Sequence, residues 1–260
     1  MKTNGKVVVL GLGEVGKPLF ELLSEYHDTL GVDISPVESS DAVDILHICY
    51  PYEIKDFIGE TARYIERYKP TLTIINSTVR VGTTRAIGEC SGASVVNSPV
   101  RGKHTRMLQD LSHYTKFVGA ADPVAGQIAI QHFQAAGLKT KLLSSPEASE
   151  LAKLTETTYF GVMIAWAQEV ERYCDQVGAD YEEVISFYDE IKFFPPVKYF
   201  PGVIGGHCVM PNIKILKQSF RSSVLEAIEA SNQMKIDRDA VAKDVGVAVA
   251  PTKALEKVAV

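Results

Sequence analysis

The apolar and polar positions of the first forty residues predict a strand, a turn, a helix and a second strand. The β-branched run KVVVL at residues 6–10 ends at Gly11, and apolar residues between Lys17 and Tyr26 recur with a helical period. The segment TLGVD at residues 29–33 then has the composition of a strand. A glycine-rich turn therefore connects the first strand to the helix.

Five further strand-like segments follow, most of them separated by helical stretches. They are Asp44–Cys49, Leu72–Asn76, Ser94–Val96, Lys116–Val118 and Lys139–Leu142. This alternation indicates an α/β domain with a doubly wound, mainly parallel sheet of the Rossmann type. The stretch from Asp33 to Asp44 is too short for a full helix, so we expect an abbreviated crossover there.

The pattern changes after Pro146. Residues 147–177 contain no proline and a single glycine, and their apolar residues recur three and four apart, which predicts one long helix ending before Gly178. A helix over about 180–191, a Pro- and Gly-rich loop over 194–211 and a helix over about 212–235 should follow. We expect a Rossmann domain at residues 1–145 and an all-helical domain at 146–260, in which the stretch from Asp237 is a short helix, a tail or a packing arm.

Composition and charge exclude several classes of protein. The chain has 27 Lys and Arg against 32 Asp and Glu, a net charge of −5, and no basic cluster of the kind that binds nucleic acid. No apolar run approaches the roughly 20 residues that span a bilayer, and the N-terminus lacks the features of a signal peptide. The four cysteines lack the spacing of a zinc site or a disulfide framework. We therefore expect a cytoplasmic protein with reduced thiols and no metal.

The turn after the first strand carries the pattern GxGxxG, as Gly11-Leu12-Gly13-Glu14-Val15-Gly16. The first glycine allows the tight turn, the second lets the backbone approach a pyrophosphate, and the third lets the helix pack on its strand. Asp33 lies at the spacing of a carboxylate that binds a ribose 2′-hydroxyl. Because Ile34-Ser35-Pro36 follow without Lys or Arg, NAD is favoured over NADP.

Two other interpretations of this turn remain open. Residues 11–17 also begin a P-loop, GxxxxGK, but Pro18 replaces the Ser or Thr that would bind magnesium. Alternatively, the glycines serve only a tight turn. Two more segments, Tyr50-Pro51-Tyr52 and Ser77-Thr78-Val79, follow strands at the edge where such sheets bind ligands.

Four segments, in order between residues 6 and about 235, resemble the UDP-glucose/GDP-mannose dehydrogenases. They are Gly11–Leu19 with its proline, Asn76–Val79 followed by Gly82-Thr83, Glu150-Leu151-Ala152-Lys153-Leu154, and Gly205-Gly206-His207-Cys208. The resemblance implies oxidation of the primary alcohol of a nucleotide sugar to a carboxylate with two NAD. It also implies subunit pairing, so we expect a homodimer through the helix at 147–177.

The resemblance also implies roles for individual residues. Cys208 would add to an aldehyde as a thiohemiacetal, and Lys153 would stabilise an oxyanion or act as a base. Thr78 would hold a water or the substrate hydroxyl, and Glu150 would orient Lys153. The cofactor would contact the following residues: Gly11, Gly13, Glu14, Val15, Gly16, Asp33, Tyr50, Pro51, Ser77 and Thr78.

The sequence departs from the family pattern at several of these positions. Thr157 replaces an asparagine four residues after Lys153, and Asn212 replaces an aspartate four residues after Cys208. Val100 and His104 stand where the family has glutamates for hydrolysis, and His104 is a candidate replacement base. The family's third domain, which binds the nucleotide of the substrate, has no counterpart before Val260. Either the substrate lacks a nucleotide, or another subunit supplies that contact, or the protein has another function.

The candidate substrate contacts are Arg101, His104, Thr157, His207 and Asn212. Arg101 belongs to a small basic group with Lys103, His104 and Arg106 that would suit an anionic substrate. The remaining histidines, His27, His47, His113 and His132, lack metal-ligand spacing and are interpreted as structural.

Three functional hypotheses remain. The favoured one is an NAD-dependent dehydrogenase of a polar, sugar-like alcohol that uses Cys208, with its active site between the two domains. The second is a two-electron dehydrogenase or reductase of the β-hydroxyacid type, in which Lys153 moves the proton and Cys208 is idle. The third is a protein that binds NAD without catalysis.

Overall fold

The computed structural model describes residues 3–33, 42–191, 199–206 and 208–244. Two compact units make up the chain, Met1–Lys153 and Leu154–Val260, and the division between them lies within the helix α6 (Pro146–Val177). Residues 34–41 of the expected crossover and residues 245–260 lie outside the described residues, whereas residues 237–244 of the expected last segment continue the helix α9 (Ser223–Asp244).

The first unit contains one seven-stranded sheet. Its order is β2-β1-β3-β4-β5-β6-β7, and every neighbouring pair is parallel except β5 with β6. The strands are β1 Thr3–Leu10, β2 His27–Val32, β3 Ile45–Ile48, β4 Leu72–Ile75, β5 Val95–Asn97, β6 Lys116–Gly119 and β7 Thr140–Leu143. The expected Rossmann-type sheet is confirmed, with one antiparallel step near its β7 edge.

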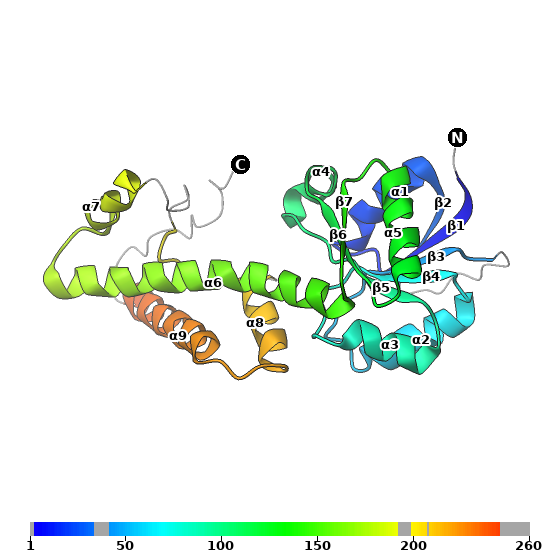
Figure 1. The fold of residues 1–260 in the computed structure, drawn as a ribbon. Helices are drawn as coiled ribbons and strands as arrows, with labels where there is room; N and C mark the ends of the chain where they lie inside the picture. The colour runs from blue at the N-terminus through cyan, green and yellow to red at the C-terminus, as the bar shows by residue number, and fades with distance from the viewer. Residues whose placement is uncertain (1–2, 34–41, 192–198, 207, 245–260) are drawn as a thin grey trace. The chain divides into compact units, whose positions relative to one another are not determined.

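Helices cover both faces of this sheet, which explains why its strands are apolar on both sides. On one face lie α1 (Gly16–Tyr26), α4 (Met107–His113) and α5 (Pro123–Ala135), and on the other lie α2 (Phe57–Tyr68) and α3 (Thr83–Ser91), as Figure 1 shows. Along β1 the residues alternate between two cores: Val7 and Val9 pack on the α1 side, Val8 and Leu10 on the α2 side. A short 3₁₀ helix, His104–Arg106, precedes α4.

The second unit is helical. The long predicted helix is confirmed as α6, and α7 (Tyr181–Ser186) with a 3₁₀ turn at Phe187–Glu190 replaces the single helix expected at 180–191. Within the described residues, no helix of either unit is both long and apolar enough to cross a membrane.

The single helix expected over 212–235 is wrong, because two helices occupy this stretch. They are α8 (Val209–Lys217) and α9 (Ser223–Asp244). The break is a closed turn: the N–H of Phe220 bonds the carbonyl of Leu216 at 3.0 Å, and the hydroxyl of Ser222 accepts from the N–H of Leu225 at 3.4 Å. Apolar periodicity continues across this turn, so the pattern alone hides it. Pro211 fits the first turn of α8, where a missing N–H costs little.

Three histidines of the first unit form a buried cluster. The Nε2 atoms of His47 and His132 lie 2.9 Å apart, and the rings of His27 and His132 stack with centroids 4.5 Å apart. The amide nitrogen of Asn76 lies 3.0 Å from Nδ1 of His47 and can only donate there. His47 therefore accepts at Nδ1 and donates from Nε2 to His132, so both rings are neutral. Burial, followed by the neighbouring His27, lowers the pKa of His132 to about 3.

This cluster predicts loss of stability in acid. The unfolded chain binds a proton at His132 below about pH 6.5 whereas the folded chain does not, so stability is complete above that pH and falls below it. Between about pH 7.5 and 5, His132 alone should cost the fold about 2 kcal/mol, or about 4–8 °C in melting temperature. His132→Gln, which keeps an acceptor for His47, should remove that part of the pH dependence.

The measurement is the melting temperature as a function of pH. His113→Gln, at an exposed histidine, is the control and should leave the pH dependence of the native chain unchanged. If the curve of His132→Gln runs parallel to that of the native chain, the cluster is not the acid-sensitive element.

Candidate functional site

The strand order reverses direction between β1 and β3, and this creates a crevice at the carboxyl ends of the strands. β1 continues to β2 on one side, while β3 pairs with the other side of β1. In parallel α/β sheets ligands bind outside such a switch point, because the loops there diverge to opposite faces. The loop from Gly11, the residue Asp33 and the loop from Cys49 all follow these three strands.

A cleft of about 440 Å³ lies at this point. Three of the predicted cofactor residues, Gly11, Asp33 and Tyr50, meet in its lining. Leu10 of β1 also lines the cleft. The remaining wall residues were not predicted from the sequence and come from the loop after β3 and the first turns of α2: Ile54, Lys55, Asp56, Glu60, Arg63 and Tyr64. Their only signal in the sequence is their position after a strand end.

The GxGxxG loop has the geometry that phosphate binding requires. Gly11 has φ +87°, and a Cβ at Gly16 would lie 1.7 Å from the carbonyl oxygen of Gly11, so no other residue fits there. At Gly13 no heavy atom of the described residues lies within 4 Å of an added Cβ, which leaves the backbone open to a ligand. Val15, at the N-cap of α1, has no polar atom with which to cap the helix. This cradle fits a pyrophosphate.

Asp33 is tied to the same loop. Its Oδ1 accepts from the N–H of Leu12 at 3.5 Å, and its side chain is exposed in the cleft. A carboxylate so placed fits a ribose hydroxyl. Across the cleft, Arg63 pairs with Glu60 one turn earlier on α2, and the hydroxyl of Tyr50 bonds the hydroxyl of Thr61 at 2.6 Å.

The ends of β3 and β4 are joined by buried polar contacts. The hydroxyl of Ser77 donates to the carbonyl of Tyr50 at 2.6 Å, so two predicted cofactor segments lie together. Thr78 follows, half-buried, and Pro51 is exposed.

Lys116, which was not predicted from the sequence, binds residues that follow β4 and β5. Its buried Nζ donates to the carbonyls of Ser98 at 2.5 Å and Pro99 at 3.1 Å, and to Oδ1 of Asn76 at 3.3 Å. Burial lowers the pKa of Lys116 to about 7. In the sequence it is simply a lysine at the start of a strand, and nothing there distinguishes it from a solvated one.

Glu150 caps a helix. Its two carboxylate oxygens accept from the N–H groups of Gly82 at 2.6 Å and Thr84 at 2.8 Å, at the N-terminus of α3. Burial raises the pKa of this carboxyl, and the hydrogen bonds from Thr84 and Gly82 oppose the shift. The orienting role expected for Glu150 toward Lys153 stays a prediction. Lys153 itself is half-buried, one turn further along α6.

In the second unit, Cys208 is the N-cap residue of α8 and is half-buried. The two departures from the family pattern meet one turn further along α8: Nδ2 of Asn212 donates to the hydroxyl of Thr157 at 2.8 Å, and both side chains are buried. The hydroxyl of Thr157 in turn donates to the carbonyl of Leu154 at 3.0 Å. Thr and Asn thus form a matched pair where the family has Asn and Asp.

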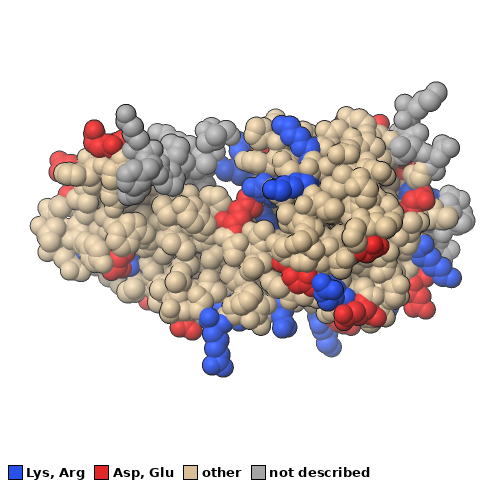
Figure 2. All heavy atoms as spheres, in the orientation of Figure 1, with Lys and Arg blue, Asp and Glu red and all other residues tan. Residues whose placement is uncertain are grey.

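The predicted basic group of the first unit is partly engaged within the protein. The guanidinium of Arg101 lies 5.1 Å from the ring centre of Tyr114, and Arg106 pairs with Asp110 at 3.1 Å. The side chain of His104 and all of His207 lie outside the described residues. On the face shown in Figure 2, basic and acidic side chains are interspersed. Among the described residues no group of three or more His, Cys, Asp or Glu could hold a metal ion.

Comparisons with known proteins place this site in context. Residues 147–243 match the central domain of the UDP-glucose/GDP-mannose dehydrogenase family. The chain is 23% identical to UDP-N-acetyl-D-mannosamine dehydrogenase from Methanocaldococcus jannaschii, over 78% of this chain and 59% of that protein. The chain therefore spans about three fifths of the length of this relative.

Solved structures share the fold. A UDP-D-ManNAc dehydrogenase from Pyrococcus horikoshii superposes with a TM-score of 0.79 at 19% identity, over 93% of this chain and 72% of that one. A 3-hydroxyisobutyrate dehydrogenase from Mycobacterium tuberculosis superposes with a TM-score of 0.62 at 20% identity, over 96% of this chain and 90% of that one. The resemblance inferred from the motifs is confirmed: residues 147–243 match the central domain of the UDP-glucose/GDP-mannose dehydrogenases, and the relatives and solved structures that the chain resembles are named as dehydrogenases.

Proposed function

We propose that the chain is an NAD-dependent dehydrogenase that oxidises the alcohol of a sugar-like or nucleotide-sugar substrate. The observation that carries the proposal is the meeting of Gly11, Asp33 and Tyr50 in one cleft at the switch point of the sheet. The family match adds the substrate class, since the relatives are named as dehydrogenases of nucleotide sugars. In this proposal residues 1–145 hold the cofactor and residues 146–260 serve the substrate and dimerisation.

The first unit would bind the cofactor through three features. The backbone of residues 11–16 faces the pyrophosphate, Asp33 accepts from a ribose hydroxyl, and Ser77 and Thr78 lie toward the nicotinamide. Bound NAD supplies the hydride acceptor, which no side chain can provide.

Lys153 and Cys208 would handle the substrate. The ammonium of Lys153 stabilises negative charge on the substrate oxygen, and Thr78 orients the hydroxyl. The thiol of Cys208 adds to an aldehyde carbon and retains it for a second oxidation, after which water releases a carboxylate. As the N-cap residue of α8, Cys208 lies where a helix terminus favours a thiolate.

A second candidate is a two-electron dehydrogenase in which Lys153 acts alone. Its support is a shared fold: the 3-hydroxyisobutyrate dehydrogenase superposes over 96% of this chain with a TM-score of 0.62. The pairing of Thr157 with Asn212 also replaces the family's Asn and Asp. In this case Cys208 has no chemical role.

The stoichiometry of NAD reduction distinguishes the two. We expect two NAD reduced for each substrate molecule when a panel of nucleotide sugars, sugar phosphates and hydroxy acids is followed by absorbance. Cys208→Ser should stop the reaction after one NAD, and Lys153→Met should slow it by about 10²–10³-fold.

Cys90→Ser, at an exposed cysteine of α3, is the matched control and should match the native chain. One NAD per substrate, unchanged by Cys208→Ser, would favour the two-electron reaction. NAD binding without turnover on any substrate would favour a protein that binds NAD and no longer reacts.

Asp33 should set the preference for NAD over NADP. Asp33→Asn replaces one of the two accepting carboxylate oxygens by an NH2 group and removes the charge that repels a 2′-phosphate, so affinity for NAD should fall about tenfold while that for NADP rises. Fluorescence titration with each dinucleotide measures both. Asp28→Asn, at an exposed position on β2, the strand that Asp33 follows, is the control, and equal losses of affinity in both variants would exclude this role.

We also propose a homodimer formed through α6. Tyr159, Trp166 and Tyr173 are each about half exposed, and their spacing of seven places them along one side of the helix. A stripe of large aromatic side chains is typical of an interface.

Trp166→Glu should therefore convert a dimer into a monomer at micromolar concentration, because it buries a charge at the centre of the stripe. Sedimentation velocity measures the change, and Met234→Glu, an equally exposed apolar residue on α9, should leave the dimer intact. Sedimentation of the native chain as a 28.5 kDa monomer would overturn the proposal.

A further inference from the structure

The loop that leads to Cys208 is held by two amide side chains. Oδ1 of Asn232 accepts from the N–H of Ile204 at 2.7 Å, and its Nδ2 donates to the carbonyl of the same residue at 3.0 Å. Nε2 of Gln168 donates to the carbonyl of Gly202 at 2.8 Å. Residues 199–206 form no regular secondary structure, so these bonds replace the backbone pairing that a strand or helix would give.

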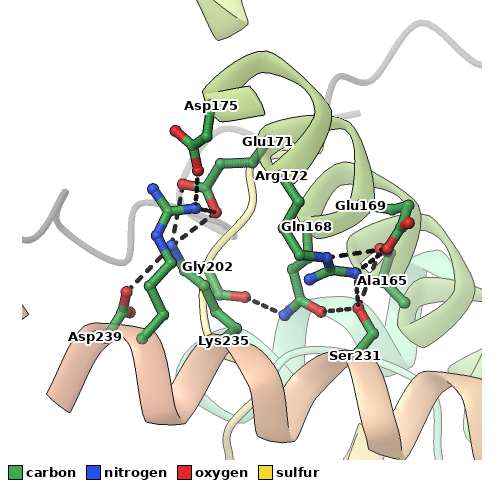
Figure 3. Close-up of polar contacts among 11 residues, drawn as sticks. Ala165, Gln168, Glu169, Glu171, Arg172, Asp175, Gly202, Ser231, Lys235 and Asp239 are labelled. Carbon is green, nitrogen blue, oxygen red and sulfur yellow. Dashed lines mark hydrogen bonds and ion pairs between the residues drawn. The ribbon is translucent and has the colours of Figure 1, made fainter. Parts of the chain in front are cut away.

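Both amides are buried and have a single possible orientation. Gln168 and Asn232 are 0% and 4% exposed. Figure 3 shows Gln168 of α6 between Ser231 of α9 and Gly202 of the loop: the hydroxyl of Ser231 donates to Oε1 of Gln168 at 2.8 Å, so Nε2 must face Gly202. Ser231 is itself fixed by Arg172, which donates to its oxygen at 3.0 Å. Leaving a buried amide without hydrogen-bond partners costs folding free energy. The alternative orientations of Gln168 and Asn232 would break these bonds, so the network has one arrangement.

Two glycines that follow this anchor, Gly205 and Gly206, have little support from neighbouring side chains. Within the described part of the chain, no heavy atom lies within 4 Å of a Cβ added at Gly205 or at Gly206, which has φ +77°. On the other side of Cys208, Val209 packs against α6 so closely that a Cβ at Gly161 would lie 3.0 Å from its side chain. The backbone around Cys208 is therefore fixed at Ile204 and at Val209.

We infer that Asn232 and Gln168 are positioning residues that set the place of the Cys208 thiol by holding Gly202 and Ile204. The inference rests on the proposed function only for the chemical role of that thiol, its addition to an aldehyde. Neither side chain is assigned contact with substrate or cofactor. They act through the loop backbone, and two glycines between the anchor and Cys208 make that anchor necessary.

The reactivity of Cys208 toward iodoacetamide tests this directly, without any enzymatic assay. Alkylation is followed on the full-length chain by peptide mass spectrometry, and exposed Cys90 in the first unit serves as an internal reference. In Asn232→Ala the loop is released, so half-buried Cys208 should react about threefold faster or more, relative to Cys90.

The matched control is Lys235→Met, three residues further along α9. Lys235 is also buried, and it pairs with Glu171 of α6 at 2.9 Å and Asp239 of α9 at 3.2 Å, so its loss weakens the same pair of helices without touching the loop. Melting temperatures of both variants monitor general loosening. Gln168→Met, which keeps the shape and removes the donor to Gly202, is the second test if Asn232→Ala does not fold, and it should also accelerate Cys208.

An alkylation ratio that rises in Asn232→Ala or Gln168→Met but not in Lys235→Met supports the inference. A ratio unchanged in the loop variants, or raised equally in Lys235→Met, overturns it, since the amides would then serve only helix packing. The proposed function fails separately, through absence of NAD reduction in the native chain. If the chain is active, Asn232→Ala should lower kcat and leave the KM for NAD unchanged.

Discussion

The close approach of Gly16 to the carbonyl of Gly11 is the constraint on which the first unit depends. A Cβ at Gly16 would lie 1.7 Å from that oxygen and 2.9 Å from the side chain of Cys49, so only glycine lets α1 begin directly beside β1. Because the helix begins there, the backbone at Gly13 is left open and Leu12 reaches Asp33. The cleft at the switch point follows from these contacts, as does its suitability for a dinucleotide.

At other places near the candidate site, buried polar side chains hold irregular backbone by hydrogen bonds. Lys116 binds the carbonyls that follow β5, Glu150 binds the first N–H groups of α3, and Asn232 binds both backbone groups of Ile204. Each of these groups is costly to bury without partners, and each has them. The segment that carries Ser77 and Thr78, and the segment up to Ile204, are therefore held in place although they lie outside helices and strands.

The substitutions within the family pattern are related to one another in the structure. Thr157 and Asn212 are far apart in the sequence, and each looks like an isolated loss of a catalytic group. Their hydrogen bond of 2.8 Å makes them a pair, in which a neutral amide and a hydroxyl satisfy each other. A carboxylate at 212 could pair with this hydroxyl only if the hydroxyl gave up its bond to the carbonyl of Leu154, and it would bring a buried charge, so the neutral pair changes the electrostatics one turn from Cys208.

The sequence by itself determined the architecture and the glycine-rich turn after the first strand. Strand and helix periods, glycine spacing and the acid at position 33 are local properties, and they predicted seven strands, the long helix and the residues of the phosphate loop. Periodicity failed at residues 218–222, because a turn closed by serine and backbone bonds leaves the apolar spacing intact. Only the tertiary structure decided the wall of the cleft on α2, the cluster around His47 and the anchors Lys116, Glu150 and Asn232. These depend on burial and on partners from distant elements. The sequence around a lysine, glutamate or asparagine does not indicate either.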